Sequence, residues 1–288
     1  MAARSPAVGA EFRSAAALRH WLDAHDHIFV LTGAGISTAS GIPDYRGPDG
    51  LWKRNAPITY QSFVRDPAMR ARYWMRSFVG WPLVAKARPN RAHAALVDLE
   101  SQGRLSALVT QNVDGLHARA GQKAVIDLHG RIDQVVCMGC GALSLRADLQ
   151  DRLAAAHPVW QHLGATTAPD GDADVEPGGI HPPIVAPECL LCNGLLKPDV
   201  VFFGENVPRE RVAAAQEALR MSDAMLVIGS SLMVYSGFRF ARMAHEAGMP
   251  IALLTRGITR ADDLATLKLD ADCVSVLAGA VDGDLIAD

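Results

Sequence analysis

Residues 28–35 read Ile-Phe-Val-Leu-Thr-Gly-Ala-Gly, an apolar run followed by two glycines with one residue between them. An unbroken apolar run of this length is typical of a strand buried on both faces, as in a parallel sheet. Glycines directly after such a strand let the backbone approach a phosphate, and a helix that begins there offers free N–H groups to the anion. The third glycine of the dinucleotide-binding pattern is replaced by Thr38. Alone, the stretch favours a nucleotide-binding turn and an ordinary tight turn about equally.

The rest of the chain alternates short apolar runs with amphipathic helical patterns, which predicts an α/β fold with a doubly wound parallel sheet. The other expected strands are Ala107–Thr110, Ala124–Asp127, Val200–Phe203, Met225–Gly229, Ile251–Thr255 and Cys273–Leu277. The expected helices are Ser14–Ala24, Pro67–Phe78, Arg91–Gln102, Pro208–Arg220 and Gly237–Ala247. Residues 53–90 look helical without strands, and residues 134–195 show little periodicity. Within the latter, Ala165–Pro187 is dense in Pro, Gly and Asp, which predicts a long surface loop.

Composition excludes several classes of protein. Of 288 residues, 49% are hydrophobic and 20% charged, which is typical of a globular chain rather than a disordered one. The 28 Lys and Arg residues against 31 Asp and Glu give a net charge of −3, which argues against a nucleic-acid partner. No apolar run reaches the roughly 18–20 residues that span a bilayer, and the N-terminus has no apolar signal core. We therefore expect a cytoplasmic protein with no membrane partner.

Four of the five cysteines form two Cys-x-x-Cys pairs, Cys137/Cys140 and Cys189/Cys192, with 48 residues between them. Two such pairs are a strong signal for tetrahedral zinc, and four thiolates leave no open coordination position. We expect one structural zinc ion. A redox pair is the alternative, but that motif normally opens a helix in a βαβ unit. A nucleic-acid zinc ribbon is disfavoured by the sparse basic residues near the pairs.

Polar residues follow two further expected strands. Gln111-Asn112-Val113-Asp114 comes directly after one, and Asp127-Leu128-His129-Gly130 ends the next. Carboxyl ends of parallel strands face the ligand crevice of an open α/β sheet. Asn112 or Asp114 serving as a plain helix cap is the alternative. The pKa of an unperturbed histidine, about 6.5, suits proton transfer near neutrality, so His129 is a candidate general base.

With Ile42-Pro43-Asp44-Tyr45-Arg46, these motifs resemble those of the sirtuin family, the NAD-dependent protein deacylases. The similarity runs from about Phe12 to Leu277, and the motifs keep the family's order. It implies a Rossmann-like NAD-binding domain with a smaller domain beside it. The large domain is built from 12–52, 92–133 and 196–288. The small one combines a helical module, 53–91, with a zinc-binding module, 134–195.

The resemblance also implies which residues contact NAD. These are Gly33, Ala34, Gly35, Ser37, Pro43, Asp44, Tyr45, Arg46, Trp52, Gln111, Asn112, Val113, Asp114, Gly229, Ser230, Ser231, Thr255, Arg256, Gly257 and Cys273. His129 and Asn112 form the catalytic centre, with His129 as general base. The implied reaction begins with attack of the acyl-lysine amide oxygen on the anomeric carbon of the nicotinamide ribose. Nicotinamide leaves, His129 helps deprotonate a ribose hydroxyl, and the products are free lysine and O-acyl-ADP-ribose.

The substrate implied by the resemblance is an acylated lysine in an extended protein segment. It would add as a strand to an edge, a mode that reads backbone more than sequence. The residues implied are Val201, Phe203, Gly204 and Glu205 on one side and Val234, in the loop around Val234–Gly237, on the other.

Several departures from the family pattern resemble its class II branch, whose members are weak deacetylases that prefer other acyl groups or ADP-ribosylate proteins. Ser236 stands where efficient deacetylases have Pro, Tyr45 replaces Phe, and Thr255 replaces Asn. Tyr73 and Arg76 share one helix face at a spacing of three and resemble the pair that binds acidic acyl groups. A packed Tyr73 with a solvated Arg76 is the plainer alternative.

We therefore expect an NAD-dependent protein-lysine deacylase that acts on acylated lysine side chains. A protein mono-ADP-ribosyltransferase with the same NAD site is the alternative within enzymology, and an NAD-binding regulator is the alternative outside it. His129 and the edge at Phe203 favour the deacylase. The sequence leaves the acyl group and the oligomeric state open.

Overall fold

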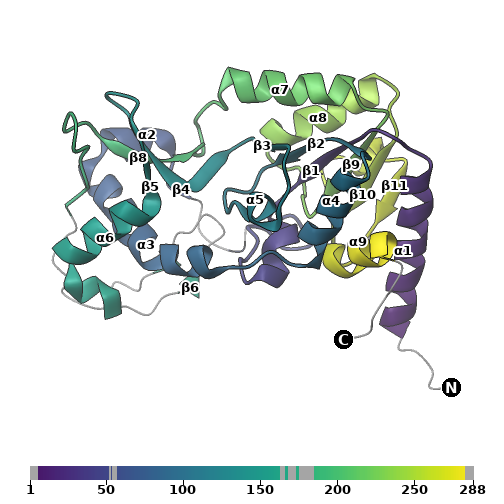
Figure 1. The fold of residues 1–288 in the computed structure, drawn as a ribbon, viewed down its shortest axis with the longest axis horizontal. Coiled ribbons are helices and arrows are strands. Elements are labelled where there is room, and N and C mark those ends of the chain that lie inside the picture. Colours follow the sequence, from purple (N-terminus) through teal and green to yellow (C-terminus); the bar gives the residue numbers. More distant parts are fainter. Residues whose placement is uncertain are drawn as a thin grey trace.

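The computed structural model describes residues 6–51, 53, 57–162, 166–167, 173–174 and 185–282. Two lobes lie side by side, and the larger one holds a six-stranded parallel sheet of order β11-β10-β9-β1-β2-β3 (Figure 1). Its strands are β1 (Ile28–Thr32), β2 (Leu105–Thr110), β3 (Val125–Asp127), β9 (Ala224–Ile228), β10 (Ile251–Leu254) and β11 (Leu267–Leu269). Within the described residues, every helix is too short or too polar to cross a bilayer.

Helices cover both faces of this sheet. On one face lie α1 (Pro6–Asp23), α4 (Arg91–Ser101) and α9 (Cys273–Asp282), and on the other α7 (Arg209–Arg220) and α8 (Tyr235–Glu246) (Figure 1). Successive side chains of β1 alternate between the two resulting cores: Val30 joins one, whereas Phe29 and Leu31 join the other. Because side chains of a strand point to opposite faces, a strand covered on both sides must be apolar throughout. This is why β1 reads as an unbroken apolar run.

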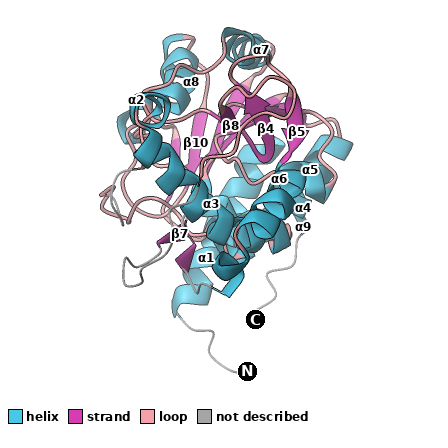
Figure 2. Cartoon of the chain, turned by 90° about the vertical axis from the view of Figure 1, so that its left-hand side faces the viewer, coloured by secondary structure: helices cyan, strands magenta, loops and turns pink. Residues whose placement is uncertain are grey.

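The smaller lobe is built around an antiparallel sheet of order β5-β4-β8, with helices packed beside it (Figure 2). Its elements are α2 (Tyr60–Arg65), α3 (Pro67–Lys86), β4 (Gly130–Cys137), β5 (Leu143–Leu145), α6 (Arg146–Ala156) and β8 (Leu196–Val200). It has its own apolar core, which includes Phe63, Trp74 and Trp160. β4 leaves the larger lobe directly after His129, and β8 returns to it, so the two lobes meet beside that histidine.

Short elements complete the fold. They are η1 (Ala34–Ser40), α5 (Leu116–Ala120), η2 (Pro158–His162), β6 (Thr166–Thr167), β7 (Ala173–Asp174) and η3 (Asp262–Leu264). The segment expected as a long loop, Ala165–Pro187, lies largely outside the described residues, which include the β6–β7 pair there.

Two of the expected strands are wrong. Cys273–Leu277 is the beginning of α9, whose start is capped by Asp272, since Asp272 Oδ1 accepts the N–H groups of Val274 and Ser275. A short apolar run fits a buried helix as well as a buried strand, so periodicity could not separate them. Val200–Phe203 is not a strand of the parallel sheet, because β8 ends at Val200 and pairs antiparallel with β4. The edge position is filled by β11, a three-residue strand too short to recognise.

Helix α3 begins as expected and ends later. Asp66 caps it, and Pro67 occupies its first turn. The helix then continues past Phe78 through Pro82, although proline cannot donate to the carbonyl four residues earlier. Gln150 Nε2 donates to that carbonyl, Phe78 O, at 2.9 Å. A side chain from α6 thus replaces the missing hydrogen bond, and the helix continues to Lys86.

Candidate functional site

A cleft of about 650 Å³ opens at the carboxyl ends of the parallel strands. Strand order reverses between β1 and β9, and such a switch point is where open α/β sheets bind ligands. Of the residues expected to contact NAD or substrate, the cleft is lined by Gly33, Ala34, Gly35, Asp44, Tyr45, Arg46, Gln111, Asn112, Val113, Val201, Phe203, Gly204, Glu205, Gly229, Ser230, Ser231, Val234, Thr255, Arg256 and Cys273. His129 also lines it.

The two glycines after β1 pack against the turn after β9. A Cβ at Gly33 would lie 2.7 Å from Ser230 Cβ, and one at Gly35 would lie 2.8 Å from Gly229 Cα. Their N–H groups donate to Ile228 O and Gly229 O. The glycines therefore bring two loops into contact, and these two N–H groups are not free for a phosphate as the sequence suggested.

The residues after β2 build a hydrogen-bonded floor. Asn112 Nδ2 donates to Gly33 O and to Ser37 Oγ, each at 3.1 Å, and Gln111 Nε2 donates to Ser230 Oγ at 2.8 Å. Ser37 Oγ in turn donates to Asp114 Oδ2 at 2.8 Å. Ser37 and Asp114 lie behind the lining residues and hold them in place.

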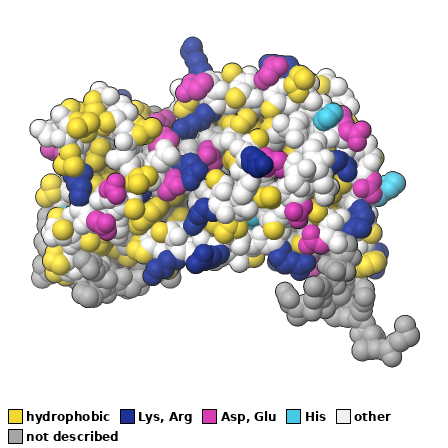
Figure 3. All heavy atoms as spheres, in the orientation of Figure 1, with side chains coloured by type: hydrophobic (Ala, Val, Ile, Leu, Met, Phe, Trp, Pro, Cys, Tyr) yellow, Lys and Arg dark blue, Asp and Glu magenta, His cyan; other side chains and the backbone are white. Residues whose placement is uncertain are grey.

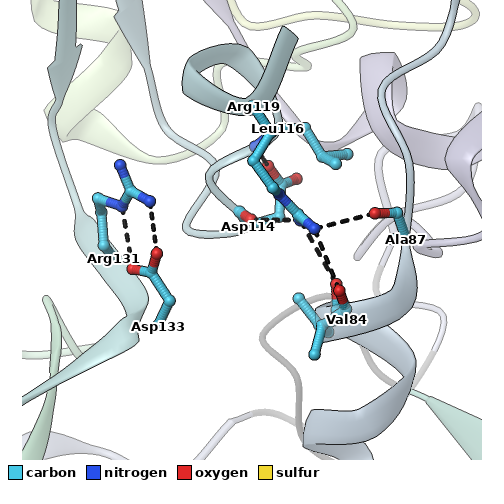
Figure 4. Close-up of polar contacts among 8 residues, drawn as sticks. Val84, Ala87, Asp114, Leu116, Arg119, Arg131 and Asp133 are labelled. Atoms are coloured by element: carbon cyan, nitrogen blue, oxygen red, sulfur yellow. Dashed lines mark hydrogen bonds and ion pairs between the residues drawn. The ribbon is translucent and has the colours of Figure 1, made fainter. Parts of the chain in front are cut away.

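Asp114 is part of this floor and also contacts the start of α5. Its Oδ1 accepts the N–H of Leu116 at 2.8 Å, but the N-cap residue of that helix is Gly115, so Asp114 is not the plain helix cap of the alternative. Burial raises the pKa of its carboxyl, opposed by these hydrogen bonds and by the charges of Arg119 and Arg131. Figure 4 shows Arg119 reaching from α5 to the carbonyls of Val84, Ala87 and Asp114, which ties this loop to the end of α3.

His129 is half-buried in the cleft lining, and both of its ring nitrogens have partners. Nδ1 lies 3.0 Å from Gln111 O, and Nε2 lies 2.7 Å from Ser236 Oγ. A carbonyl only accepts, so Nδ1 carries the hydrogen, and Nε2 accepts the hydrogen of the Ser236 hydroxyl. Burial lowers the pKa of His129 to about 4, with contributions from Arg211 and Arg239. The ring is therefore neutral at pH 7, with Nε2 able to accept a proton.

The edge expected to bind the peptide lies beside His129. Val201 N–H donates to His129 O at 2.8 Å. Phe203 O and Gly204 O accept the Tyr60 N–H and the Gln61 side chain, so α2 already holds one side of this edge. Lys197 is buried and bridges Val200 O and Glu205 Oε2, which fixes the turn between them.

Some expected residues lie away from the cleft lining. Tyr73 packs against the rings of Phe63, Trp74 and Phe202, and neither it nor Arg76 lines the cleft. Pro43 and Gly257 also lie outside the lining. Gly257 has φ +81°, and a Cβ there would lie 2.0 Å from Pro48 O, so it admits a close loop contact. Trp52 lies outside the described residues.

The four paired cysteines converge in the smaller lobe, and their Sγ atoms all lie within 4.8 Å of one another. Cys137 and Cys192 are 3.5 Å apart, and Cys140 and Cys189 are 3.9 Å apart, far beyond a disulfide bond. A tetrahedron with bonds of about 2.3 Å to zinc gives S···S separations of about 3.8 Å. A Cβ at Gly194 would lie 2.9 Å from Cys137 Sγ, so the turn after Cys192 needs glycine there. The arrangement fits a tetrahedral metal.

Of the α8 residues that line the cleft, Arg239 was not assigned to the site from the sequence. Tyr235 and Ser236 also line it and belong to the loop Val234–Gly237 that was expected beside the peptide. Ser236 and Arg239 are three residues apart, so the sequence predicts that they share a helix face. The sequence does not predict that this face meets the carboxyl end of β3, because that depends on how α8 packs on the sheet.

Comparisons with known proteins agree with this geometry. The sequence profile described as Sir2 family matches residues 33–236. The chain is 54% identical over 261 residues to "NAD-dependent protein deacetylase 2" of Bradyrhizobium diazoefficiens, covering 91% of this chain and 95% of that one. It is 55% identical over 262 residues to "NAD-dependent protein deacetylase" of Xanthomonas campestris pv. campestris, covering 91% and 89%.

Solved structures show the same similarity. A Sir2 complex with a p53 peptide and NAD+ has a TM-score of 0.70 at 31% identity, covering 93% of this chain and 97% of that one. Sir2Tm bound to a propionylated peptide has a TM-score of 0.72 at 30% identity, with the same coverage.

Proposed function

The chain belongs to the Sir2 family, and we propose how its cleft removes acyl groups from protein lysines. The protein is an NAD-dependent protein deacylase. The observation that carries the proposal is His129, which lines the cleft with Nδ1 fixed by Gln111 O and Nε2 able to accept a proton.

The size of the cleft suits NAD. Its volume of about 650 Å³ lies within the range of small-molecule and cofactor sites. We assign its glycine-rich end, at Gly33 and Gly229, to the phosphates, which would lie against these turns without bonds from their N–H groups. We assign the floor at Asn112, which Asp114 supports from behind, to the nicotinamide ribose and carboxamide. When bound, NAD supplies an electrophilic anomeric carbon and becomes the acceptor of the acyl group. The remaining NAD contacts predicted from the motifs are part of this proposal.

The proton-transfer role belongs to His129. A neutral imidazole with its hydrogen on Nδ1 accepts a proton at Nε2, and Gln111 O stabilises the charge that then forms on the ring. A positioned base of this kind contributes about 10²–10⁴-fold to a rate. Asn112 positions Gly33 and Ser37 beside the same centre.

The acylated lysine enters beside Val201, Phe203, Gly204 and Glu205 on one side and Val234 on the other, as proposed from the motifs. Their presence in the lining of one cleft with His129 supports this arrangement. An acidic acyl group at Tyr73 and Arg76 stays a prediction of the sequence. Its test is Arg76→Met, which should lower activity on succinyl- or glutaryl-lysine far more than on acetyl-lysine. Equal losses would contradict it.

We propose one zinc ion at Cys137, Cys140, Cys189 and Cys192, in a structural role. All four donors are thiolate sulfurs, and a complete set of protein ligands leaves no position for a reacting water. The backbone N–H groups of Gly139 and Leu191 point at Cys137 Sγ and Cys189 Sγ, which stabilises the thiolate form.

The finer points of organisation are proposals from the sequence. We propose domains at 12–52, 92–133 and 196–288 against 53–91 and 134–195, a cytoplasmic location, and no nucleic-acid or membrane partner. On the face shown in Figure 3, basic and acidic side chains are intermixed, which supports the last point.

The decisive experiment incubates a panel of acyl-lysine peptides with protein and NAD and follows them by mass spectrometry. We expect one peptide class to lose its acyl group only with NAD, with O-acyl-ADP-ribose as co-product. His129→Ala should abolish the reaction, whereas His245→Ala, at an exposed histidine of α8, should retain it. Nicotinamide release without any change in the peptides would favour ADP-ribosyl transfer, and no turnover of NAD would favour a binding protein.

A further inference from the structure

The charged groups that line the cleft are almost all committed to one another. Asp44 pairs with Lys53, Glu205 pairs with Lys197 at 3.1 Å, and Asp272 pairs with Arg256 at 3.4 Å. These are the three carboxylates of the cleft lining among the described residues. Each carboxylate of the described cleft lining therefore already has a cationic partner, and none is left to pair with another cation of the lining.

Arg239 is a further cation in this lining. Its Nε is buried and has no hydrogen-bond acceptor in the described part of the chain, and no carboxylate there pairs with it. The guanidinium lies over the Tyr235 ring, 5.3 Å from its centroid. Stacking on an aromatic face holds a guanidinium in place while leaving its in-plane donors available for an anion.

The position of Arg239 assigns it to the acyl-lysine side of the cleft. It follows Ser236 by three residues on α8, and Ser236 bonds the general base at 2.7 Å. Both residues belong to the helix that begins after Val234, on the substrate side. The glycine-rich turns that would hold the phosphates of NAD lie at the ends of β1 and β9.

We propose that Arg239 is a carboxylate-binding residue, so that the enzyme favours acyl-lysine substrates that carry a carboxylate. A guanidinium and a carboxylate form two parallel, charge-assisted hydrogen bonds. A phosphate fits the same donors, but the phosphates of NAD are assigned to the glycine-rich end of the cleft. The carboxylate comes from the end of the acyl chain or from an acidic residue beside the lysine. The inference rests on the deacylase activity proposed above and names the substrate class of that site.

Arg242 is a matched control for Arg239. It lies one turn further along α8, and its guanidinium also stacks on Tyr235, 5.6 Å from the centroid. It is exposed, pairs with Glu246 at 3.4 Å, and does not line the cleft. The two arginines thus share charge, helix and aromatic partner, and differ in whether they face the cleft.

The test compares three peptides of equal length: acetyl-lysine with neutral neighbours, glutaryl-lysine with the same neighbours, and acetyl-lysine beside a glutamate. For each acidic peptide, kcat/KM is divided by that of the neutral peptide, which cancels any effect of Arg239 on His129. Arg239→Gln should lower at least one of these ratios about tenfold or more. Arg239→Lys should restore part of it, and Arg242→Gln should leave the ratios as in the wild type.

The outcomes separate the two sources of carboxylate. A fall for glutaryl-lysine alone assigns Arg239 to the end of the acyl chain, and a fall for the glutamate peptide alone assigns it to the neighbouring residue. Unchanged ratios, or the same fall for Arg242→Gln, overturn the proposal. Peptide affinities from fluorescence anisotropy, measured without NAD, keep the inference distinct from the proposed activity. A chain that turned over no peptide would refute the activity, whereas carboxylate-dependent binding lost in Arg239→Gln would still support the site.

Discussion

Ser236 Oγ lies 2.7 Å from Nε2 of His129, the nitrogen that has to accept a proton during the reaction. Because Nδ1 is held by Gln111 O, the serine hydroxyl donates to the lone pair on Nε2. The chain's own hydroxyl thus occupies the position that a substrate hydroxyl needs. A proline at this position would have no hydroxyl and could not make this contact, so the contact depends on Ser236.

Replacing Ser236 by Ala should raise the deacetylation kcat by about fivefold. The substrate must displace a hydrogen bond of about 1 kcal/mol to reach the base, and the variant removes that step. Ser236→Thr keeps the hydroxyl and should behave like the wild type. Steady-state kinetics with saturating NAD check this, and a tenfold loss in Ser236→Ala would instead mean that the serine passes the proton on.

The acid limb of the pH–rate profile should lie well below the usual histidine range. Burial lowers the pKa of His129 to about 4, so the active neutral ring persists as the pH falls through 6.5. We expect kcat/KM on a neutral acetyl peptide to stay level from pH 7 to about 5, with circular dichroism recording the folded fraction at each pH. A limb near 6.5 in fully folded protein would contradict the burial argument.

Stability should fall with acid because of two further buried histidines. Burial lowers the pKa of His93 to about 4 and that of His117 to about 3. Above pH 6.5 both states hold neutral rings. Between 6.5 and about 4 only the unfolded state takes up the proton, so the free energy of unfolding falls as the pH falls.

Removing one of these histidines isolates its contribution. His93→Gln should reduce the pH slope of the free energy of unfolding by about 1.4 kcal/mol per pH unit in that window. The raised pKa of Asp127, about 6, acts in the opposite direction and is common to both proteins. His245→Gln, at an exposed position, should leave the slope as it is. Urea titrations at a series of pH values give both slopes, and equal slopes for wild type and His93→Gln would refute the assignment.

Loss of the metal should unfold the smaller lobe before the larger one. Cys192→Ser breaks a set of four thiolates whose binding energy is also folding energy. We expect about one zinc ion fewer per chain and a melting temperature lower by about 10 °C. Cys273→Ser, at a buried cysteine remote from the cluster, should retain the metal. Elemental analysis with calorimetry measures both, and a zinc-free protein that melts like the wild type would exclude a structural metal.

The buried Lys197 should control peptide binding more than NAD binding. Its ammonium joins Val200 O to Glu205 Oε2 and so fixes the turn that carries Phe203 and Gly204. Lys197→Met keeps the apolar stem and removes both bonds, so the peptide KM should rise about tenfold. Lys197→Arg should recover part of the loss. A rise in the KM of NAD of the same size would point to general misfolding instead.

Much of the fold could be predicted because its signals are local. The apolar run at 28–32 is long enough to require burial on both faces, and it is β1. The spacing of the two Cys-x-x-Cys pairs predicted that four sulfurs bind one metal ion, and the four sulfur atoms lie together in the structure. The helix start at Asp66 and Pro67 follows from capping chemistry alone. Where a run was short and apolar, as at Cys273–Leu277, the local signal was ambiguous, and packing against α1 and α4 decided for a helix.

The amino-acid order specifies which chemical groups the protein carries and how they follow one another, because the motifs after the strands are contiguous. Which of these groups meet depends on the packing of the folded chain. It turned the two glycines at 33 and 35 into a contact between loops and placed Tyr73 in an aromatic cluster outside the cleft lining. It also brought Ser236 and Arg239 to His129 across more than a hundred residues. Such encounters depend on how a helix packs on a sheet, and no local pattern encodes that orientation.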